Sequence, residues 1–183
     1  MESMHFQTKR LLIRTLKITD SDPFFDMMGN PKVMNPIPQK AMSKTESDIT
    51  LKKLIALEKN SPKKIWSLIE KETSNFIGIC GFLKNNEDEP EIAYRLREDY
   101  WKKGYGTEIA EGLINFGFKT LNFNLITADV NIVNTKSVKI LEKFFIQDFE
   151  FFNKRDNCTD RRYKLTKENW VKRQENKENF NTI

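Results

Sequence analysis

Trp101-Lys102-Lys103-Gly104-Tyr105-Gly106-Thr107 lies between a strand-like run, Glu91–Leu96, and a helix-like run that starts near Thr107. A strand that enters such a turn and continues as a helix brings unpaired backbone N–H groups together, and the helix dipole favours negative charge there. Gly104 and Gly106 allow a ligand to approach the backbone closely, and the two lysines add positive charge. The stretch therefore predicts an anion site for phosphate or pyrophosphate.

The spacing of this turn excludes two familiar phosphate loops. A Walker loop requires G-x-x-x-x-G-K-[ST], and the chain contains no such run. A dinucleotide fingerprint requires a third glycine three residues after Gly106, but Ile109 stands there. The turn alone therefore leaves the phosphate ligand unidentified.

Length and composition favour one folded domain. The 183 residues, 38% of them hydrophobic and 14 of them Phe, suffice for a substantial core. We expect a single domain over residues 1–183, with a flexible tail over 174–183. The first residues lack the apolar core of a signal peptide, and no run is long enough to span a membrane. We therefore expect a cytoplasmic protein that does not bind membranes.

Charge and metal-ligating residues limit the possible partners. The net charge is +5, which fits either attraction to an acidic nucleotide or ribosomal surface, or a merely solubilising surface. Direct nucleic-acid binding rests on this charge alone, and we expect none. His5 is the only histidine, so we expect neither a histidine triad nor a metal site. Cys80 and Cys158 form no C-x-x-C pair, and both are expected to be reduced thiols.

The remaining pattern predicts one mixed sheet flanked by helices. A helix is expected to follow the capping residues before Pro23 and to stop at Gly29, whereas the Pro31–Pro38 segment is expected to be irregular. Ser43 and Glu46 form a capping box for a helix with four residues on its apolar face, Ile49, Leu51, Leu54 and Ile55. The expected strands are Leu11–Leu16, Ile65–Glu70, Phe76–Leu83, Glu91–Leu96, Leu125–Val130, Phe149–Phe152 and Arg162–Leu165.

Five motifs occur in an order that matches a known family. They are T-K-R-L-L-I-R at 8–14, N-P-K-V-M at 30–34, E-I-A-Y at 91–94 with Y-W-K-K-G-Y-G-T-E at 100–108, N-T-K-S at 134–137 and L-T-K-E-N-W at 165–170. Together they resemble the GCN5-related N-acetyltransferase (GNAT) superfamily, in particular its ribosomal-protein N-acetyltransferase branch (the RimJ/RimL type). The resemblance covers nearly the whole chain.

This resemblance implies an α/β fold with a single mixed, mostly antiparallel sheet of about seven strands, flanked by helices and containing a splayed parallel strand pair. It also implies acetyl-CoA as cosubstrate and no metal. Pantetheine would hydrogen-bond to the strand backbone at Tyr94, Arg95, Leu96 and Arg97. The pyrophosphate would be bound by Trp101, Lys102, Lys103, Gly104, Tyr105, Gly106 and Thr107. Asn134 would reach the cofactor from the next loop, and Ser137 is a further candidate cofactor ligand.

The chain departs from the family pattern at four positions. Trp101 stands where the general motif has Gln or Arg, as is normal for the RimJ/RimL branch. Lys102 replaces a glycine, so the turn is more basic and less flexible. Leu141 replaces a tyrosine that many relatives have. Phe145 stands where a helix-ending glycine is usual, so we expect a changed helix end there.

Acetyl transfer to an amine requires a base for the amine proton, a donor for the oxygen that gains charge, and a weak acid for the leaving thiolate. Glu91 is the candidate base, with a surface carboxylate as its alternative role. Glu89 replaces it as the candidate if a bulge turns the strand. Ser137 is the candidate acid or cofactor ligand, unless it only hydrogen-bonds locally. Asn134 could be a plain N-cap, and Tyr94 could be a core residue.

The resemblance therefore implies an acetyl-CoA-dependent N-acetyltransferase. The first hypothesis is that the acceptor is the N-terminal amine of a (ribosomal) protein. Alternatives are a small amine such as an antibiotic or polyamine, or a CoA-binding module without catalysis. The acceptor is expected in the groove between Pro31–Lys44 and the last strands. The sequence leaves open whether the protein is a monomer or a homodimer.

Overall fold

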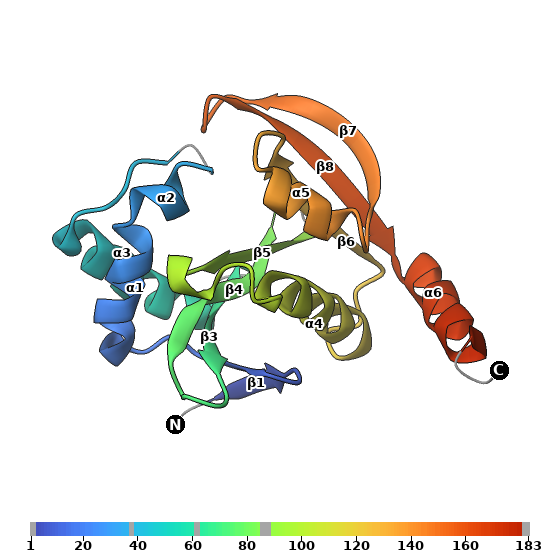
Figure 1. Ribbon diagram of the computed structural model, residues 1–183, viewed down its shortest axis with the longest axis horizontal. Coiled ribbons are helices and arrows are strands. Elements are labelled where there is room, and N and C mark those ends of the chain that lie inside the picture. Colours follow the sequence, from blue (N-terminus) through green and yellow to red (C-terminus); the bar gives the residue numbers. More distant parts are fainter. Residues whose placement is uncertain (1–2, 37–38, 61–62, 85–88, 181–183) are drawn as a thin grey trace.

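The computed structural model describes residues 3–36, 39–60, 63–84 and 89–180 (Figure 1). Its strands form one eight-stranded sheet in the order β1-β2-β3-β4-β5-β6-β8-β7. Each neighbouring pair is antiparallel except β5 and β6, which are parallel. The strands are β1 (Met4–Gln7), β2 (Leu11–Arg14), β3 (Lys64–Glu70), β4 (Phe76–Lys84), β5 (Pro90–Leu96), β6 (Leu125–Asn131), β7 (Ile146–Asn153) and β8 (Cys158–Thr166).

Helices cover both faces of this sheet. They are α1 (Ser21–Met28), α2 (Pro31–Met34), α3 (Lys44–Asn60), α4 (Tyr105–Lys119), α5 (Thr135–Leu141) and α6 (Lys167–Phe180), with short 3-10 turns at Ile18–Asp20 and Glu98–Tyr100. One buried cluster forms around α4 and includes Ile92, Ile109 and Leu113. A second forms under α1–α3 and includes Phe24 and Leu51. Figure 1 shows α1–α3 grouped at one end, and the β7–β8 hairpin with its tip toward α2.

The capping box that the sequence predicts for α3 is present. The Ser43 hydroxyl accepts from the Glu46 N–H at 3.3 Å, and the Glu46 carboxylate accepts from the Ser43 N–H at 2.7 Å. Leu51, on the apolar face of this helix, is fully buried, as expected. Ile49 is 48% exposed, so its assignment to the apolar face is wrong.

Two predictions before α3 are also wrong. Pro31 begins a short helix, α2, instead of an irregular segment, because the Asn30 side chain caps it by accepting from the Lys32 N–H at 2.9 Å. Pro38 lies outside the described residues. Asp20, one of the capping residues expected before Pro23, makes no side-chain bond to the start of α1 and is instead buried, with both carboxylate oxygens bound by Arg14 at 2.7 and 2.9 Å.

The parallel pair β5–β6 separates almost at once. Only Glu91 and Thr127 are in register between the two strands. The Thr127 hydroxyl donates to the Pro90 carbonyl at 3.3 Å, and beyond this point the strands diverge. A mixed sheet with a splayed parallel pair is therefore present as expected, with eight strands where about seven were predicted. The unexpected strand is β1, whose four residues contain no fully buried side chain.

The sequence made one prediction about the end of α5 and another about the tail that contains the end of α6. Helix α5 ends at Leu141, and the N–H of buried Phe145 donates to the Leu141 carbonyl at 2.8 Å without a left-handed residue. This is a changed helix end, as the missing glycine suggested. Helix α6 continues to Phe180, and residues 181–183 lie outside the described residues. The flexibility of the tail stays a prediction.

Candidate active site

A cavity of ≈ 910 Å³ opens where β5 and β6 separate. One wall consists of residues from the segment containing α1–α3, including Met28, Gln39 and Met42. The opposite wall belongs to the β7–β8 hairpin, with Arg155 and Asp156 near its turn. Arg155 lowers the pKa of Asp156, and Gln39 on the opposite wall lies close enough to contribute to this shift. The cavity has room for a cofactor end together with a small group of another molecule.

Strand β5 has two distinct faces because its register with β4 is unbroken from Pro90 to Leu96. Ile92, Tyr94 and Leu96 pack in the cluster around α4. Residues 91, 93, 95 and 97 therefore lie on the face toward α1 and α2. Since no bulge interrupts the pairing of β5 with β4, Glu91 keeps this orientation.

Glu91 is 8% exposed and lines the cavity. The guanidinium groups of Arg155 and Arg162 are close enough to interact with its charge. A carboxylate at the start of the strand separation is placed to accept a proton from a group that enters the cavity.

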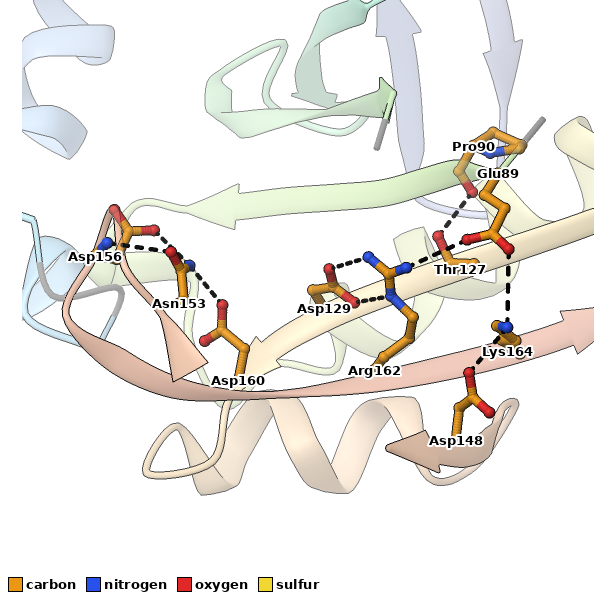
Figure 2. A network of polar contacts seen from close by, with 10 residues as sticks. All are labelled: Glu89, Pro90, Thr127, Asp129, Asp148, Asn153, Asp156, Asp160, Arg162 and Lys164. Atoms are coloured by element: carbon orange, nitrogen blue, oxygen red, sulfur yellow. Dashed lines mark hydrogen bonds and ion pairs between the residues drawn. The ribbon is translucent and has the colours of Figure 1, made fainter. Parts of the chain in front are cut away.

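Glu89, the rival base, belongs to a polar network (Figure 2). Its carboxylate accepts from Arg162 at 3.2 Å and lies 3.8 Å from Lys164. The same Arg162 guanidinium donates to both Asp129 carboxylate oxygens at 2.8 Å. Arg162 on β8 thus ties β6 to the residue before β5, and Lys164 extends the network to Asp148 at 2.9 Å. This network lies at the end where β5 and β6 are paired, and it holds the two strands together there. Glu89 is part of this network.

The opposite side of the cavity carries hydroxyl groups from Tyr94 and from Ser137 on α5. Among the described residues, no well-aligned hydrogen bond reaches the buried Tyr94 hydroxyl. Burial raises its pKa well above the usual range, and the nearby Ser137 hydroxyl offsets only part of that effect. Both hydroxyls therefore remain protonated at neutral pH. Leu141 also lines the cavity and brings no polar group.

Asn134 caps α5. Its side-chain oxygen accepts from the Ser137 N–H at 3.4 Å, which is the local role that the sequence left open. The residue also lines the cavity, and its side-chain amide nitrogen has no hydrogen bond to another described residue. It can therefore cap the helix and still donate toward the cavity.

The glycine turn leads into α4, which begins at Tyr105, two residues earlier than predicted. Gly104 has φ 83° and Lys102 has φ 61°, so both adopt the left-handed conformation. Lys102 thus occupies a conformation that favours glycine, at the position where the resemblance places one. Gly106 allows α4 and α5 to pack closely, because a Cβ there would lie 2.9 Å from Ile140 Cδ1.

The backbone N–H groups of residues 102–107 have no hydrogen-bond acceptor within the described part of the chain. Six consecutive free donors at the start of a 15-residue helix fit a pyrophosphate group. Lys102 and Lys103 lie beside these donors and add positive charge.

Arg10, the residue before β2, hydrogen-bonds to the glycine turn, and the sequence did not predict this role. It donates to the Lys103 carbonyl at 2.9 Å and to Glu108 at 2.6 Å, and it lies 4.2 Å from the centre of the Tyr105 ring. The Tyr105 hydroxyl donates to Glu70, so only the backbone of Tyr105 is available to a ligand. The sequence did contain a signal for this contact, because Arg10 and Glu108 both belong to the motifs at 8–14 and 100–108.

The structure therefore divides the expected site residues into two groups. Glu91, Tyr94, Arg95, Asn134 and Ser137 line the cavity. The turn residues do not line it and lie at the start of α4. Leu96 and Arg97 lie between the groups, where the Leu96 carbonyl accepts from the Trp101 indole at 3.1 Å and Arg97 pairs with Asp26 at 2.8 Å.

In the described residues, no helix is long and apolar enough to cross a membrane, and no group of three or more His, Cys, Asp or Glu side chains could hold a metal ion. Cys80 and Cys158 are free, and burial raises the pKa of both thiols.

Known proteins share this arrangement. Residues 10–144 match the family described as the acetyltransferase (GNAT) domain. The chain is similar to the uncharacterized N-acetyltransferase p20 of Bacillus licheniformis, with 34% identity over 152 residues that cover 80% of this chain and 83% of p20. A solved GNAT-family acetyltransferase from Bacillus anthracis superposes with a TM-score of 0.80 at 22% identity, covering 91% of this chain and 99% of that one.

Two other solved structures with this fold are named for different acceptors. RimL, the ribosomal L7/L12 alpha-N-protein acetyltransferase in complex with coenzyme A, superposes with a TM-score of 0.75 at 13% identity over 90% of this chain and 98% of its own. A chimera of the spermidine N-acetyltransferase SpeG from Vibrio cholerae superposes with a TM-score of 0.72 at 18% identity over 89% of this chain and 99% of its own. At these identities the likeness concerns the fold alone.

Proposed function

The chain belongs to the GNAT acetyltransferase family, and on this premise we propose that it transfers the acetyl group of acetyl-CoA to the N-terminal amine of a protein. The observation that carries the cofactor assignment is the row of free N–H groups at residues 102–107, next to the separated strands. Backbone donors at a helix start are suited to a pyrophosphate. The unpaired edge of β5 after Glu91 offers further backbone groups for pantetheine.

The proposed chemistry assigns a task to each side of the cavity. Acetyl-CoA supplies an activated thioester. Glu91 accepts the proton of the incoming amine, directly or through water, so that the neutral amine can attack. A backbone N–H of β5 donates to the carbonyl oxygen as it gains charge. The Ser137 hydroxyl, with Tyr94 behind it, donates a proton toward the leaving sulfur, a role that Leu141 cannot fill.

The charges of the cavity lining support a protein N-terminus over a polycation. Asp129 and Asp156 line it but are paired with Arg162 and Arg155 at 2.8 and 2.6 Å. Asp160 accepts from Asn153 at 2.7 Å. Because two of these three carboxylates are already paired with arginines, the lining offers little attraction to a polyamine. Acetylation of a small amine, as in the spermidine enzyme of the same fold, remains the second candidate.

A thiol-release assay tests this proposal. We expect the full chain to release CoA from acetyl-CoA with short peptides that have a free N-terminus, and not with the same peptides blocked at the N-terminus. Turnover only with spermidine or an aminoglycoside would assign the second candidate. Tight acetyl-CoA binding in calorimetry with no turnover on any amine would show a binding module without catalysis.

A further inference from the structure

Arg95 differs from the other arginines of this protein in its partners. Six of the eight pair with a carboxylate, namely Arg10, Arg14, Arg97, Arg155, Arg161 and Arg162. Arg173 donates to a backbone carbonyl. Arg95 alone among the described arginines has neither partner, and its guanidinium lies 3.0 Å from the Met28 sulfur and 3.2 Å from the Met34 sulfur.

Two thioether sulfurs do not satisfy a guanidinium. Thioethers are weak acceptors and carry no charge, whereas a guanidinium presents five N–H donors in a planar fork. The protein around Arg95 is dense enough that burial lowers its pKa to about 10, which leaves it charged at neutral pH. An unpaired cation in such surroundings costs stability unless an anion joins it. This environment therefore suits an anion that the folded chain does not itself supply.

The position of Arg95 indicates where that anion comes from. Arg95 lines the same cavity as Glu91 and lies on the same face of β5, with Ala93 between them. At about 3.3 Å per residue, four residues separate the two Cα atoms by roughly 13 Å. Long side chains at both positions can approach one small molecule from two ends. The glycine turn, by contrast, is at the start of α4, whose core contacts are with the other face of β5.

We propose that Arg95 binds a carboxylate of the acetyl acceptor, so that the preferred acceptor is a primary amine with a carboxylate a few bonds away. This inference rests on the proposed function. A free amino acid and a peptide with an acidic first residue share this chemistry. The planar fork of Arg95 would hold the carboxylate while Glu91 faces the amine. A polyamine lacks the carboxylate and would meet a like charge in this position.

Matched acceptors test the inference in two arms. The first compares L-aspartate with its diamide, and the second compares C-terminally amidated peptides that begin with Asp or with Asn. In at least one arm we expect the wild-type kcat/KM to be on the order of 100-fold higher for the carboxylate form, because truncating a buried charge pair has effects of this size. The arm that shows the preference identifies the source of the carboxylate.

Three variants separate binding from structure. Arg95→Gln should abolish the preference, whereas Arg155→Gln, which removes a paired cation from the same cavity, should preserve it. Arg95→Met should abolish the preference and raise the melting temperature, because it removes an unpaired charge beside two methionines. If Arg95 only stabilises the fold, Arg95→Met should lower the melting temperature instead.

The outcomes separate this inference from the proposed function. Equal use of carboxylate and carboxamide acceptors, or a preference that survives in Arg95→Gln, overturns the inference and leaves the acetyltransferase intact. If no amine is acetylated, the proposed function fails, and calorimetry in the presence of CoA decides the inference. Binding of aspartate or the Asp peptide that is lost in Arg95→Gln supports it, and absence of such binding overturns it.

Discussion

The two faces of strand β5 present different kinds of chemistry. On the face toward α4, Ile92, Tyr94 and Leu96 join a hydrophobic cluster, and the strand continues into a turn with free backbone donors. On the face toward α1 and α2, Glu91 and Arg95 bring charged side chains to the cavity. One strand thus separates a region that binds through its backbone from a region that binds through its side chains.

This difference teaches why the cofactor is easier to identify than the acceptor. A backbone site depends on glycine spacing and helix position, and both are local in the sequence. A side-chain site depends on residues that only the fold brings together. The sulfurs beside Arg95 come from Met28 and Met34, more than 60 residues earlier.

The largest effect is expected on the side-chain face, from Glu91→Gln. This variant should lower kcat by about 100-fold or more, because general-base catalysis contributes at least this factor. The affinity for acetyl-CoA should not change, since the amide keeps the shape of the carboxylate. Single-turnover thiol release and calorimetry measure the two quantities.

Glu89→Gln provides the matched comparison, since Glu89 is held by Arg162 at 3.2 Å. It should impair turnover less than Glu91→Gln does. A larger loss of turnover in Glu89→Gln than in Glu91→Gln would assign the base to Glu89 and contradict the roles given to the two carboxylates.

Arg14 is paired with the buried carboxylate of Asp20 and therefore provides a contrast with Arg95. Burial raises the pKa of Asp20, but hydrogen bonds from Arg14 and from the Lys17 backbone outweigh this, so the net shift is downward. Asp20→Asn should therefore lower the free energy of unfolding by about 2 kcal/mol at neutral pH. Urea unfolding of both proteins measures the difference.

The sign of the pH dependence follows from the lowered pKa. The stabilisation by Asp20 is fully present above the carboxyl's unfolded pKa and is lost as pH falls through its lower folded value. The gap between wild type and Asp20→Asn should consequently narrow below about pH 4. A gap that stays constant down to pH 2 would show that the ionised pair is not what stabilises the fold.

The sequence predicted features that local chemistry controls. The glycine turn and the Ser43 capping box follow from residues within a few positions of each other, as do most strands. The features it missed depend on distant partners. Asp20 fits a cap by sequence but pairs with Arg14, and Ile49 fits a helical apolar face but is 48% exposed. Arg95 was assigned to the cofactor through its backbone, because its sulfur neighbours cannot be foreseen from the sequence.

The smallest expected effect concerns the turn itself. Lys102→Gly should raise the free energy of unfolding by about 1 kcal/mol, since Lys102 has φ 61° and glycine relieves that conformation. It should also weaken acetyl-CoA binding slightly through loss of a charge. Lys103→Gly removes the same charge without relieving a left-handed conformation, so it should not stabilise the fold. Equal stability changes in the two variants would contradict this account of the turn.

The most direct test of the division between the two faces compares acetyl-CoA dissociation constants for Gly104→Val and Arg95→Gln in parallel calorimetry. Gly104 has φ 83°, which valine disfavours, so Gly104→Val should raise the Kd about tenfold or more while the protein stays folded. Arg95→Gln should leave the Kd within about twofold of wild type, because a tenfold change would require about 1.4 kcal/mol of direct contact. Equal loss of affinity in both variants, or normal binding in Gly104→Val, would contradict the account.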